Sequence, residues 1–414
     1  MFRRLLSFDE AERVISRYIP AGPLGVECVA ILGAFGRVLA EDVVAGLDVP
    51  SFDRSTVDGF AVRARDTFGA DENSPAKLRV GGNAVVGKLS RCAVRSGVAV
   101  GIVTGAPLPV GADAVVMVED TEFKRGVLLV RSAVVEGSNV MRAGSDFKKG
   151  EVVLRRGAVL GSAEVGVLAA VGLADVDVFV VPRVAVLSTG AEVTRPGGKL
   201  LPGRVFDTNA YGLCAAVVES GGVPVFLGVF PDRAAVIRRA LVKALACADV
   251  VVTSGGVSVG PKDFLPGVLG SFGEPGVVVS GVAIKPGKPF TVAVVGGKLV
   301  FALPGHPASA LLVFRLFVRP VIEALGGRKP RGFVEVKAVA GARMFSAKGR
   351  RTFVSVKLKR DERGELVAEP VPVGLSGAIS TLAGADGFVE VAENRMFFDA
   401  GDEVAVKLLK ECKV

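Results

Sequence analysis

After Pro182 the chain alternates between short apolar runs and segments whose apolar residues recur with helical spacing. This alternation is typical of βαβ units, in which parallel strands form a sheet with helices on both faces. We therefore expect a doubly wound, mostly parallel α/β domain. The expected strands are 183–188, 224–230, 249–253, 277–284, 291–295 and 299–303, and the expected helices are 209–220, 233–246 and 307–325.

Earlier segments follow other patterns. Ser7-Phe-Asp-Glu10 has the form of a capping box, and a helix is expected over 8–19. Residues 77–135 alternate β-rich runs with Gly and Pro turns, which predicts a small all-β unit. A further helix is expected from an N-cap at Ser162 to about residue 171.

The length of 414 residues suits two to four domains. From about residue 330 onward, Val-rich alternation with Gly turns predicts a small β-barrel or sandwich. The most apolar stretch, 165–181, is interrupted by Asp175 and Asp177, so no membrane span is expected. The first ten residues turn acidic where a signal peptide needs its apolar region. The chain is therefore expected in the cytoplasm.

The net charge of +9 favours an anionic partner. Trp is absent, only two Tyr are present and no basic run is interleaved with aromatic residues, so nucleic acid is not expected. The cysteines form no C-x-x-C pair, which disfavours zinc and disulfides and fits a reducing compartment. They stand at positions 28, 92, 214, 247 and 412.

The most informative motif is Thr253-Ser-Gly-Gly-Val-Ser-Val-Gly-Pro-Lys-Asp263, which follows an apolar run. Ligands of open α/β sheets bind where strands end and loops lead into helices. The N–H groups of Gly255 and Gly256, with the hydroxyls of Ser254 and Ser258, can hold phosphate oxygens. A tight turn without a ligand would use the same glycines.

Further loops favour the ligand, because loops that follow strands of one sheet meet at one edge. Ser188-Thr-Gly-Ala-Glu192 offers hydroxyls and a carboxylate. Lys285 and Lys288 lie on a proline-stiffened loop that suits an oxyanion. Asp207-Thr-Asn209 opens a helix, where a plain N-cap would look the same. Leu303-Pro-Gly-His-Pro307 begins the last helix of the domain.

A competing pattern is Gly256-Val-Ser258-Val-Gly260, which fits the nucleophile elbow of serine hydrolases, with His306 following in chain order. A structural or capping role explains His306 more simply, and Lys285 and Lys288 have no place in a hydrolase triad. We therefore disfavour a serine hydrolase.

Two weaker patterns are also set aside. Gly82 to Lys88 resembles a P-loop, but Leu89 replaces the magnesium-binding hydroxyl and no helix is expected after it. Glu119 and Asp120 could be paired acid–base carboxylates, although a solvated strand end explains them better. Neither pattern supports a separate active site.

Together with Ser55-Thr-Val-Asp-Gly-Phe-Ala61, Thr104-Gly-Ala-Pro-Leu-Pro109 and Gly137-Ser-Asn-Val-Met-Arg-Ala-Gly-Ser-Asp146, these motifs resemble the molybdopterin molybdenumtransferase family, which includes MoeA-type proteins and the gephyrin E domain. The resemblance covers nearly the whole chain, in the family's order. It implies a transferase of molybdenum cofactor biosynthesis that takes adenylylated molybdopterin (molybdopterin-AMP), inserts molybdate or tungstate at the dithiolene and releases AMP, with Mg²⁺. The alternative is a carrier or scaffold paralogue that binds molybdopterin without turnover.

The resemblance also implies an elongated homodimer of four-part subunits, with a molybdopterin adenylyltransferase as a protein partner. The implied parts are a discontinuous N-terminal dimerisation domain (1–45 and 138–180), an inserted small β domain (46–137), the α/β molybdopterin-binding domain (181–326) and a C-terminal β-barrel (327–414).

Roles for individual residues follow from the same resemblance. The implied catalytic residues are Asp58, Thr104, Asp263, Lys285, Lys288, Arg350 and Ser376. The implied cofactor-binding residues are Thr189, Gly190, Glu192, Asp207, Asn209, Ser254, Gly255, Gly256, Ser258, Pro289, Pro304 and Gly305. The implied magnesium ligands are Glu192, Asp232 and Asp263.

Four positions depart from the family's usual pattern. Val110 replaces a more usual polar residue after Leu108-Pro109. His306 stands where Asn is usual. Thr352 replaces the commoner Glu, which leaves both Arg350 and Arg351 open as the oxyanion partner. The region around Ser376 reads Gly-Leu-Ser-Gly rather than Gly-Ser-Gly.

Overall fold

The computed structural model describes residues 5–257, 265–330, 332–371 and 379–409. The chain forms two compact units: residues 28–35 and 41–177 make up one, and 1–27, 36–40 and 178–414 make up the other. We call them the β unit and the α/β unit. Two paired strands, β1 (Val26–Ala30) and β12 (Asp175–Phe179), carry the chain between them. The division into four domains stays a prediction.

The α/β unit contains the expected mostly parallel sheet, in the order β16-β13-β17-β21-β20-β18. The first four strands run parallel, and β20 is antiparallel to both of its neighbours, β21 and β18. The strands are β13 (Arg183–Thr189), β16 (Val223–Phe230), β17 (Val250–Ser254), β18 (Gly276–Ser280), β20 (Thr291–Val295) and β21 (Lys298–Leu303). Strand β18 ends four residues earlier than expected, and the chain then forms β19 (Ile284–Lys285).

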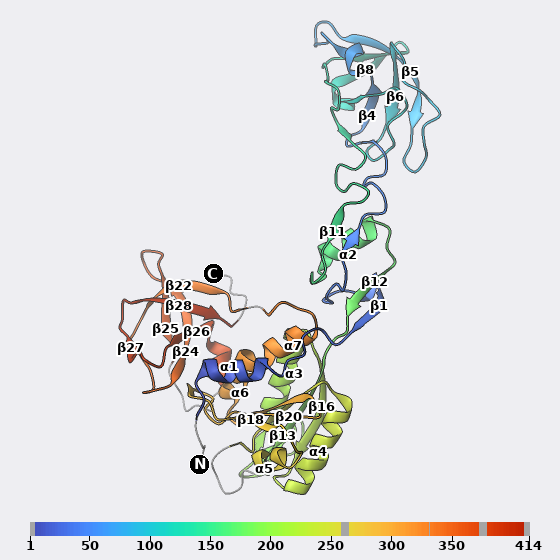
Figure 1. Ribbon diagram of the computed structural model, residues 1–414. Coiled ribbons are helices and arrows are strands. Elements are labelled where there is room, and N and C mark those ends of the chain that lie inside the picture. Colours follow the sequence, from blue (N-terminus) through green and yellow to red (C-terminus); the bar gives the residue numbers. More distant parts are fainter. Residues whose placement is uncertain (1–4, 258–264, 331, 372–378, 410–414) are drawn as a thin grey trace. The chain divides into compact units, whose positions relative to one another are not determined.

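Helices cover both faces of this sheet (Figure 1). Alternate residues of β13 enter separate cores: Val184 and Val186 pack with one set of helices, and Ala185 and Leu187 with the other. The first set is α3 (Asn209–Glu219), α6 (Pro307–Val313), the π-helical turn η4 (Phe314–Val318) and α7 (Arg319–Leu325). The second set is α4 (Ala234–Cys247) and α5 (Leu265–Gly270).

The first helix, α1 (Phe8–Ser16), has the predicted capping box. Glu10 N donates to Ser7 Oγ at 3.2 Å, and Ser7 N donates to Glu10 Oε2 at 2.8 Å. The helix ends before residue 19, and its Phe8 ring packs 5.1 Å from that of Phe317. Helix α1 therefore belongs to the packing of the α/β unit.

The C-terminal strands form a barrel, and not a sandwich. Their order is β24-β25-β22-β28-β26, and β24 also pairs with β26, which closes the ring. These strands are β22 (Glu335–Ala340), β24 (Arg351–Arg360), β25 (Leu366–Pro370), β26 (Gly387–Val391) and β28 (Glu403–Leu408). Strands β23 (Met344–Phe345) and β27 (Phe397–Phe398) pair beside them, and α8 spans Ile379–Gly384.

The β unit holds a six-stranded sheet in the order β7-β4-β6-β5-β9-β8. Its strands are β4 (Gly59–Val62), β5 (Ala76–Ala84), β6 (Val98–Ile102), β7 (Ala114–Met117), β8 (Thr121–Lys124) and β9 (Val127–Val130). Gly82 lies within β5 and no helix follows it, which confirms that Gly82–Lys88 is not a P-loop. Short pairs β2 (Val43–Val44) with β11 (Val152–Leu154) and β3 (Arg54–Ser55) with β10 (Val140–Met141) complete this unit.

The second predicted N-cap was wrong by one residue. Helix α2 spans Ser162–Ala170 and its N-cap is Gly161, because Gly161 N donates to the Glu164 carboxylate at 2.9 Å. Three 3₁₀ turns, η1 (Ile31–Gly33), η2 (Ala64–Thr67) and η3 (Val118–Asp120), also lie in the described part of the chain. Glu119 and Asp120 thus belong to a turn that leads into β8.

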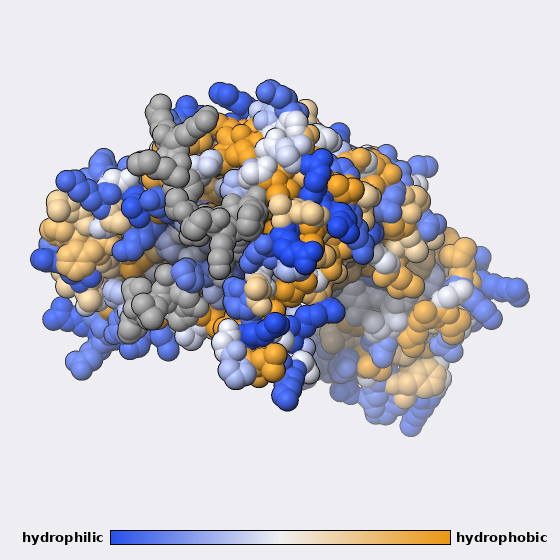
Figure 2. All heavy atoms as spheres, turned by 90° about the horizontal axis from the view of Figure 1, so that it is seen from below, coloured by the Kyte–Doolittle hydropathy of each residue, from blue (hydrophilic) through white to orange (hydrophobic). Residues whose placement is uncertain are grey.

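The surface seen in Figure 2 mixes charged and apolar residues over the visible face. Within the described ranges, each helix is too short or too polar to cross a bilayer.

Candidate functional site

Three parallel strands end side by side and define the site. The register pairs Ser188 of β13 with Ser254 of β17, and Ser254 with Leu303 of β21. Their following loops open onto a pocket of about 920 Å³ at the carboxyl edge of the sheet. This is where an open α/β sheet binds its ligand, so the predicted meeting of the loops is confirmed.

The turn after β17 requires glycine. Gly255 has φ of +93°, and a Cβ atom there would lie 2.5 Å from Thr189 O. Its N–H donates to Leu303 O at 3.2 Å, so this group is bonded to the end of β21 and is not aimed at a phosphate as expected. The glycine turn therefore lets three loops approach one another closely.

Asn209, at the start of α3, ties two of these loops together. Its Nδ2 donates to Ser254 Oγ at 2.6 Å and to Gly305 O at 2.7 Å. Because Ser254 Oγ accepts this bond, the proton of the hydroxyl is available for an acceptor in the pocket. Asn209 is itself almost buried, at 9% exposure.

Two oxygen atoms of the pocket lining are buried without a partner in the described part of the chain: Thr189 Oγ1 and Asp207 Oδ2. The other Asp207 oxygen, Oδ1, accepts from Ser188 Oγ and from Ala210 N, each at 3.0 Å. Buried polar atoms are normally hydrogen-bonded, so unpaired ones in a pocket indicate a missing ligand or ion.

Eleven of the twelve implied cofactor-binding residues line this pocket, together with the implied magnesium ligand Asp232. They are Thr189, Gly190, Glu192, Asp207, Asn209, Ser254, Gly255, Gly256, Pro289, Pro304 and Gly305. The twelfth, Ser258, lies outside the described residues, as do Asp263 and Ser376.

One part of the pocket lining was not predicted from the sequence. Leu200, Arg204, Val205 and Phe206, around β14 (Val193–Thr194) and β15 (Val205–Phe206), line the pocket, and Ile379 of α8 joins them. Their position directly before Asp207 was the available signal. His306 also lines the pocket and is the N-cap residue of α6, although its side chain makes no capping hydrogen bond.

The acidic lining suits a hard cation only in part. Glu192 and Asp232 both line the pocket, but no cluster of three metal-binding side chains occurs among the described residues. Mg²⁺ commonly uses one or two carboxylates plus substrate phosphates, and this donor set fits that mode.

The loop that carries Lys285 and Lys288 adjoins the barrel. Strand β19 pairs in parallel with β24, with Ile284 opposite Arg351 and Lys285 opposite Thr352. Pro289, at the end of the same loop, lines the pocket. Lys285 therefore lies beside β24, which begins at Arg351, directly after Arg350.

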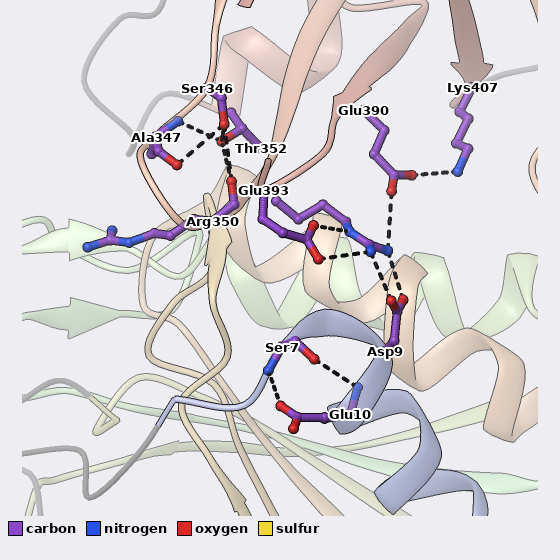
Figure 3. A network of polar contacts seen from close by, with 11 residues as sticks. Ser7, Asp9, Glu10, Ser346, Ala347, Arg350, Thr352, Glu390, Glu393 and Lys407 are labelled. Atoms are coloured by element: carbon purple, nitrogen blue, oxygen red, sulfur yellow. Dashed lines mark hydrogen bonds and ion pairs between the residues drawn. The ribbon is translucent and has the colours of Figure 1, made fainter. Parts of the chain in front are cut away.

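The two arginines have different surroundings (Figure 3). Arg351 contacts three carboxylates, those of Asp9, Glu390 and Glu393. The Arg350 guanidinium points away from this network and makes no hydrogen bond or ion pair with any described residue. Of the two, Arg350 is the one whose charge is available to a ligand.

Asp58 and Thr104 meet within the β unit. Thr104 donates to Asp58 Oδ1 from its backbone N at 2.7 Å and from Oγ1 at 2.9 Å. These bonds lower the pKa of Asp58, the backbone bond having the larger effect. Asp58 is thus kept ionised on an exposed edge of the β unit.

Three family models match successive parts of the chain. They describe the MoeA N-terminal region (domains I and II), over residues 6–172, a probable molybdopterin-binding domain, over 185–324, and the MoeA C-terminal region (domain IV), over 337–409. Their order along the chain is the one expected from the motifs.

Curated relatives match over almost their full length. Molybdopterin molybdenumtransferase 2 of Mycobacterium tuberculosis is 35% identical, covering 97% of this chain and 98% of its own. Molybdopterin molybdenumtransferase of Bacillus subtilis is 33% identical, covering 99% and 95%.

A crystal structure of a molybdopterin biosynthesis MoeA protein from Pyrococcus horikoshii is similar at a TM-score of 0.82 and 40% identity, covering 99% of this chain and 100% of that one. A second such structure gives a TM-score of 0.80 at 33% identity, covering 98% and 100%. With the family models, these matches show that the chain belongs to the molybdopterin molybdenumtransferase family.

Proposed function

We propose that this protein inserts molybdenum into molybdopterin during molybdenum cofactor biosynthesis, with adenylylated molybdopterin and molybdate as substrates and AMP as product. The main support is the pocket, in which Thr189 Oγ1 and Asp207 Oδ2 are buried with no partner among the described residues and are therefore available to a polar ligand. The family membership supplies the reaction class.

The pocket offers separate groups for separate parts of the substrate. The hydroxyls of Thr189 and Ser254 would bind phosphate oxygens beside the Gly255 turn. Glu192 and Asp232, with Asp263, would hold Mg²⁺, which when bound neutralises phosphate charge. The tetrahedral dianion of molybdate or tungstate would lie near Lys285, Lys288 and Arg350, with Ser376 as a further ligand.

A homodimer completes this proposal. In the β unit, Leu32 is 95% and Phe35 is 73% exposed, and Leu168 is the only buried residue of the mainly apolar helix α2. Exposed apolar groups of this kind are costly unless a partner covers them. We place Asp58 and Thr104 of one subunit at the pocket of the other.

Mixing two inactive variants tests the dimer. Asp58→Asn and Lys285→Ala would each be inactive alone, whereas heterodimers formed after mixing and subunit exchange would regain one intact site. Random pairing would restore roughly a quarter of the wild-type rate. Failure to regain activity, despite exchange shown by mass spectrometry, would place both residues in one subunit's site.

The reaction itself is tested by AMP release from adenylylated molybdopterin with Mg²⁺, in the presence of molybdate, tungstate or neither. Oxyanion-dependent release, coupled to metal-loaded cofactor, is the expected result. Precursor that is bound but never cleaved would instead indicate a carrier. Adding a purified molybdopterin adenylyltransferase, as the proposed cytoplasmic partner, would show whether direct delivery speeds turnover.

A further inference from the structure

The lysine loop is held between helix α1 and the barrel by backbone hydrogen bonds. Ala283 N donates to Leu6 O at 2.7 Å, and Arg351 N donates to Ala283 O at 3.0 Å. Leu6 forms a parallel bridge with Val282. The residue two positions before Lys285 is thus bonded on one side to the segment that leads into α1 and on the other to β24.

A side-chain pair closes the same arrangement. Arg351 Nη1 and Nη2 lie 2.9 and 3.0 Å from the two oxygens of Asp9, in the first turn of α1. The Arg351 guanidinium also lies 4.8 Å from the centre of the Phe8 ring. A bidentate arginine–carboxylate pair fixes orientation as well as distance, so it holds α1 against β24 on either side of the lysine loop.

The remaining contacts of the Arg351 guanidinium are also with carboxylates. Nε lies 3.1 Å from Glu393 Oε2, and Nη1 lies 3.4 Å from Glu390 Oε1. Three carboxylates around one guanidinium leave no positive charge there for a substrate oxyanion. The neighbouring Arg350 points away from the network (Figure 3). Because the two residues are adjacent in the chain, fixing the orientation of Arg351 also fixes the backbone that carries Arg350.

We propose that Asp9 and Arg351 are positioning residues of the oxyanion site: their ion pair clamps the 281–285 segment between α1 and β24, and so sets Lys285 relative to Arg350. This inference rests on the proposed function. In this proposal neither Asp9 nor Arg351 contacts the substrate. Asp9 is 57% exposed at its side chain, and pairs that exposed contribute little to stability, so the effect expected is on site geometry.

The test uses Asp9→Asn in the full-length protein, which keeps the shape of the side chain and removes its charge. Glu403→Gln is the matched control, because it makes the same chemical change in the exposed Lys337–Glu403 pair of the barrel. Asp9→Glu keeps the charge and serves as the conservative rescue. Calorimetry measures the Kd of molybdate and, in separate titrations, the Kd of AMP.

We expect Asp9→Asn to weaken molybdate binding about fivefold, in line with coupling between residues of one network. AMP binding should be unchanged, Glu403→Gln should match wild type, and Asp9→Glu should recover most of the affinity. Molybdate affinity unchanged in Asp9→Asn would overturn the inference alone, and equal loss of molybdate and AMP binding would show a merely structural role. Wild-type protein that binds no oxyanion would overturn both this inference and the oxyanion part of the proposed function.

Discussion

Asp58 accepts two hydrogen bonds from Thr104, a residue 46 positions later in the chain, through one carboxylate oxygen. The pair joins two motifs that the sequence shows only as separate strings. Since both bonds favour the ionised carboxylate, the relationship is electrostatic as well as geometric.

Thr104→Val removes the hydroxyl donor and keeps the backbone N–H. The pKa of Asp58 should therefore rise from its wild-type value but stay below that of a free aspartate, because the backbone bond is the larger cause of the shift. A carboxyl-detected NMR titration measures this. Thr121→Val is the control, since Thr121 bonds to Val118 O and not to Asp58. An unmoved pKa would mean that the hydroxyl bond does not form in solution.

The same shift predicts a pH dependence. A carboxyl whose folded pKa is depressed stabilises the fold above its unfolded pKa, which is about 3.9 for aspartate. That contribution disappears as the pH falls through the folded pKa. Chemical denaturation of wild type and Asp58→Asn across the acidic range should therefore converge at low pH and diverge above it. Parallel curves would contradict the assignment.

Arg350→Ala should weaken binding of the oxyanion and leave the fold intact. Its guanidinium has no partner in the described part of the chain, so removing it breaks no ion pair there. Loss of one charge-assisted hydrogen bond corresponds to an increase of about 10- to 100-fold in the KM for molybdate. Steady-state AMP release measures the effect, with Lys337→Ala as a charge-matched control. A normal KM would remove Arg350 from the site.

Asn209→Ala should destabilise the pocket from within. It strips a donor from Gly305 O and from the buried Ser254 Oγ, and a buried unsatisfied group costs about 1–3 kcal/mol. Urea denaturation would give the stability change, and AMP binding should weaken because two loops lose their link. Wild-type stability with wild-type AMP affinity would show that water replaces the amide.

Phe290→Ala should give the largest loss of stability of these variants. The ring is fully buried and stacks 4.9 Å from Phe317, centroid to centroid. Removing a buried phenylalanine side chain costs about 3–5 kcal/mol. Thermal unfolding measures the change, and Phe123→Ala, on an exposed ring, is the control.

Much of the fold could be predicted because its signals are local. The capping box of Ser7 and Glu10 depends on residues three apart, and the βαβ alternation repeats along the chain. Motif order then predicted the pocket lining, since parallel strands bring their carboxyl ends to one edge. Gly161 was missed as an N-cap because the sequence does not show which backbone N–H the Glu164 carboxylate takes.

The sequence by itself determined the family, the α/β architecture and the loops that carry the pocket. Tertiary structure alone decided between barrel and sandwich, directed the Gly255 N–H to Leu303, and distinguished Arg350 from Arg351. The physical reason is that hydrophobic period and turn chemistry act over a few residues, whereas each of these outcomes depends on a partner distant in the chain. Arg351 is occupied because Asp9, 342 residues earlier, is folded against it.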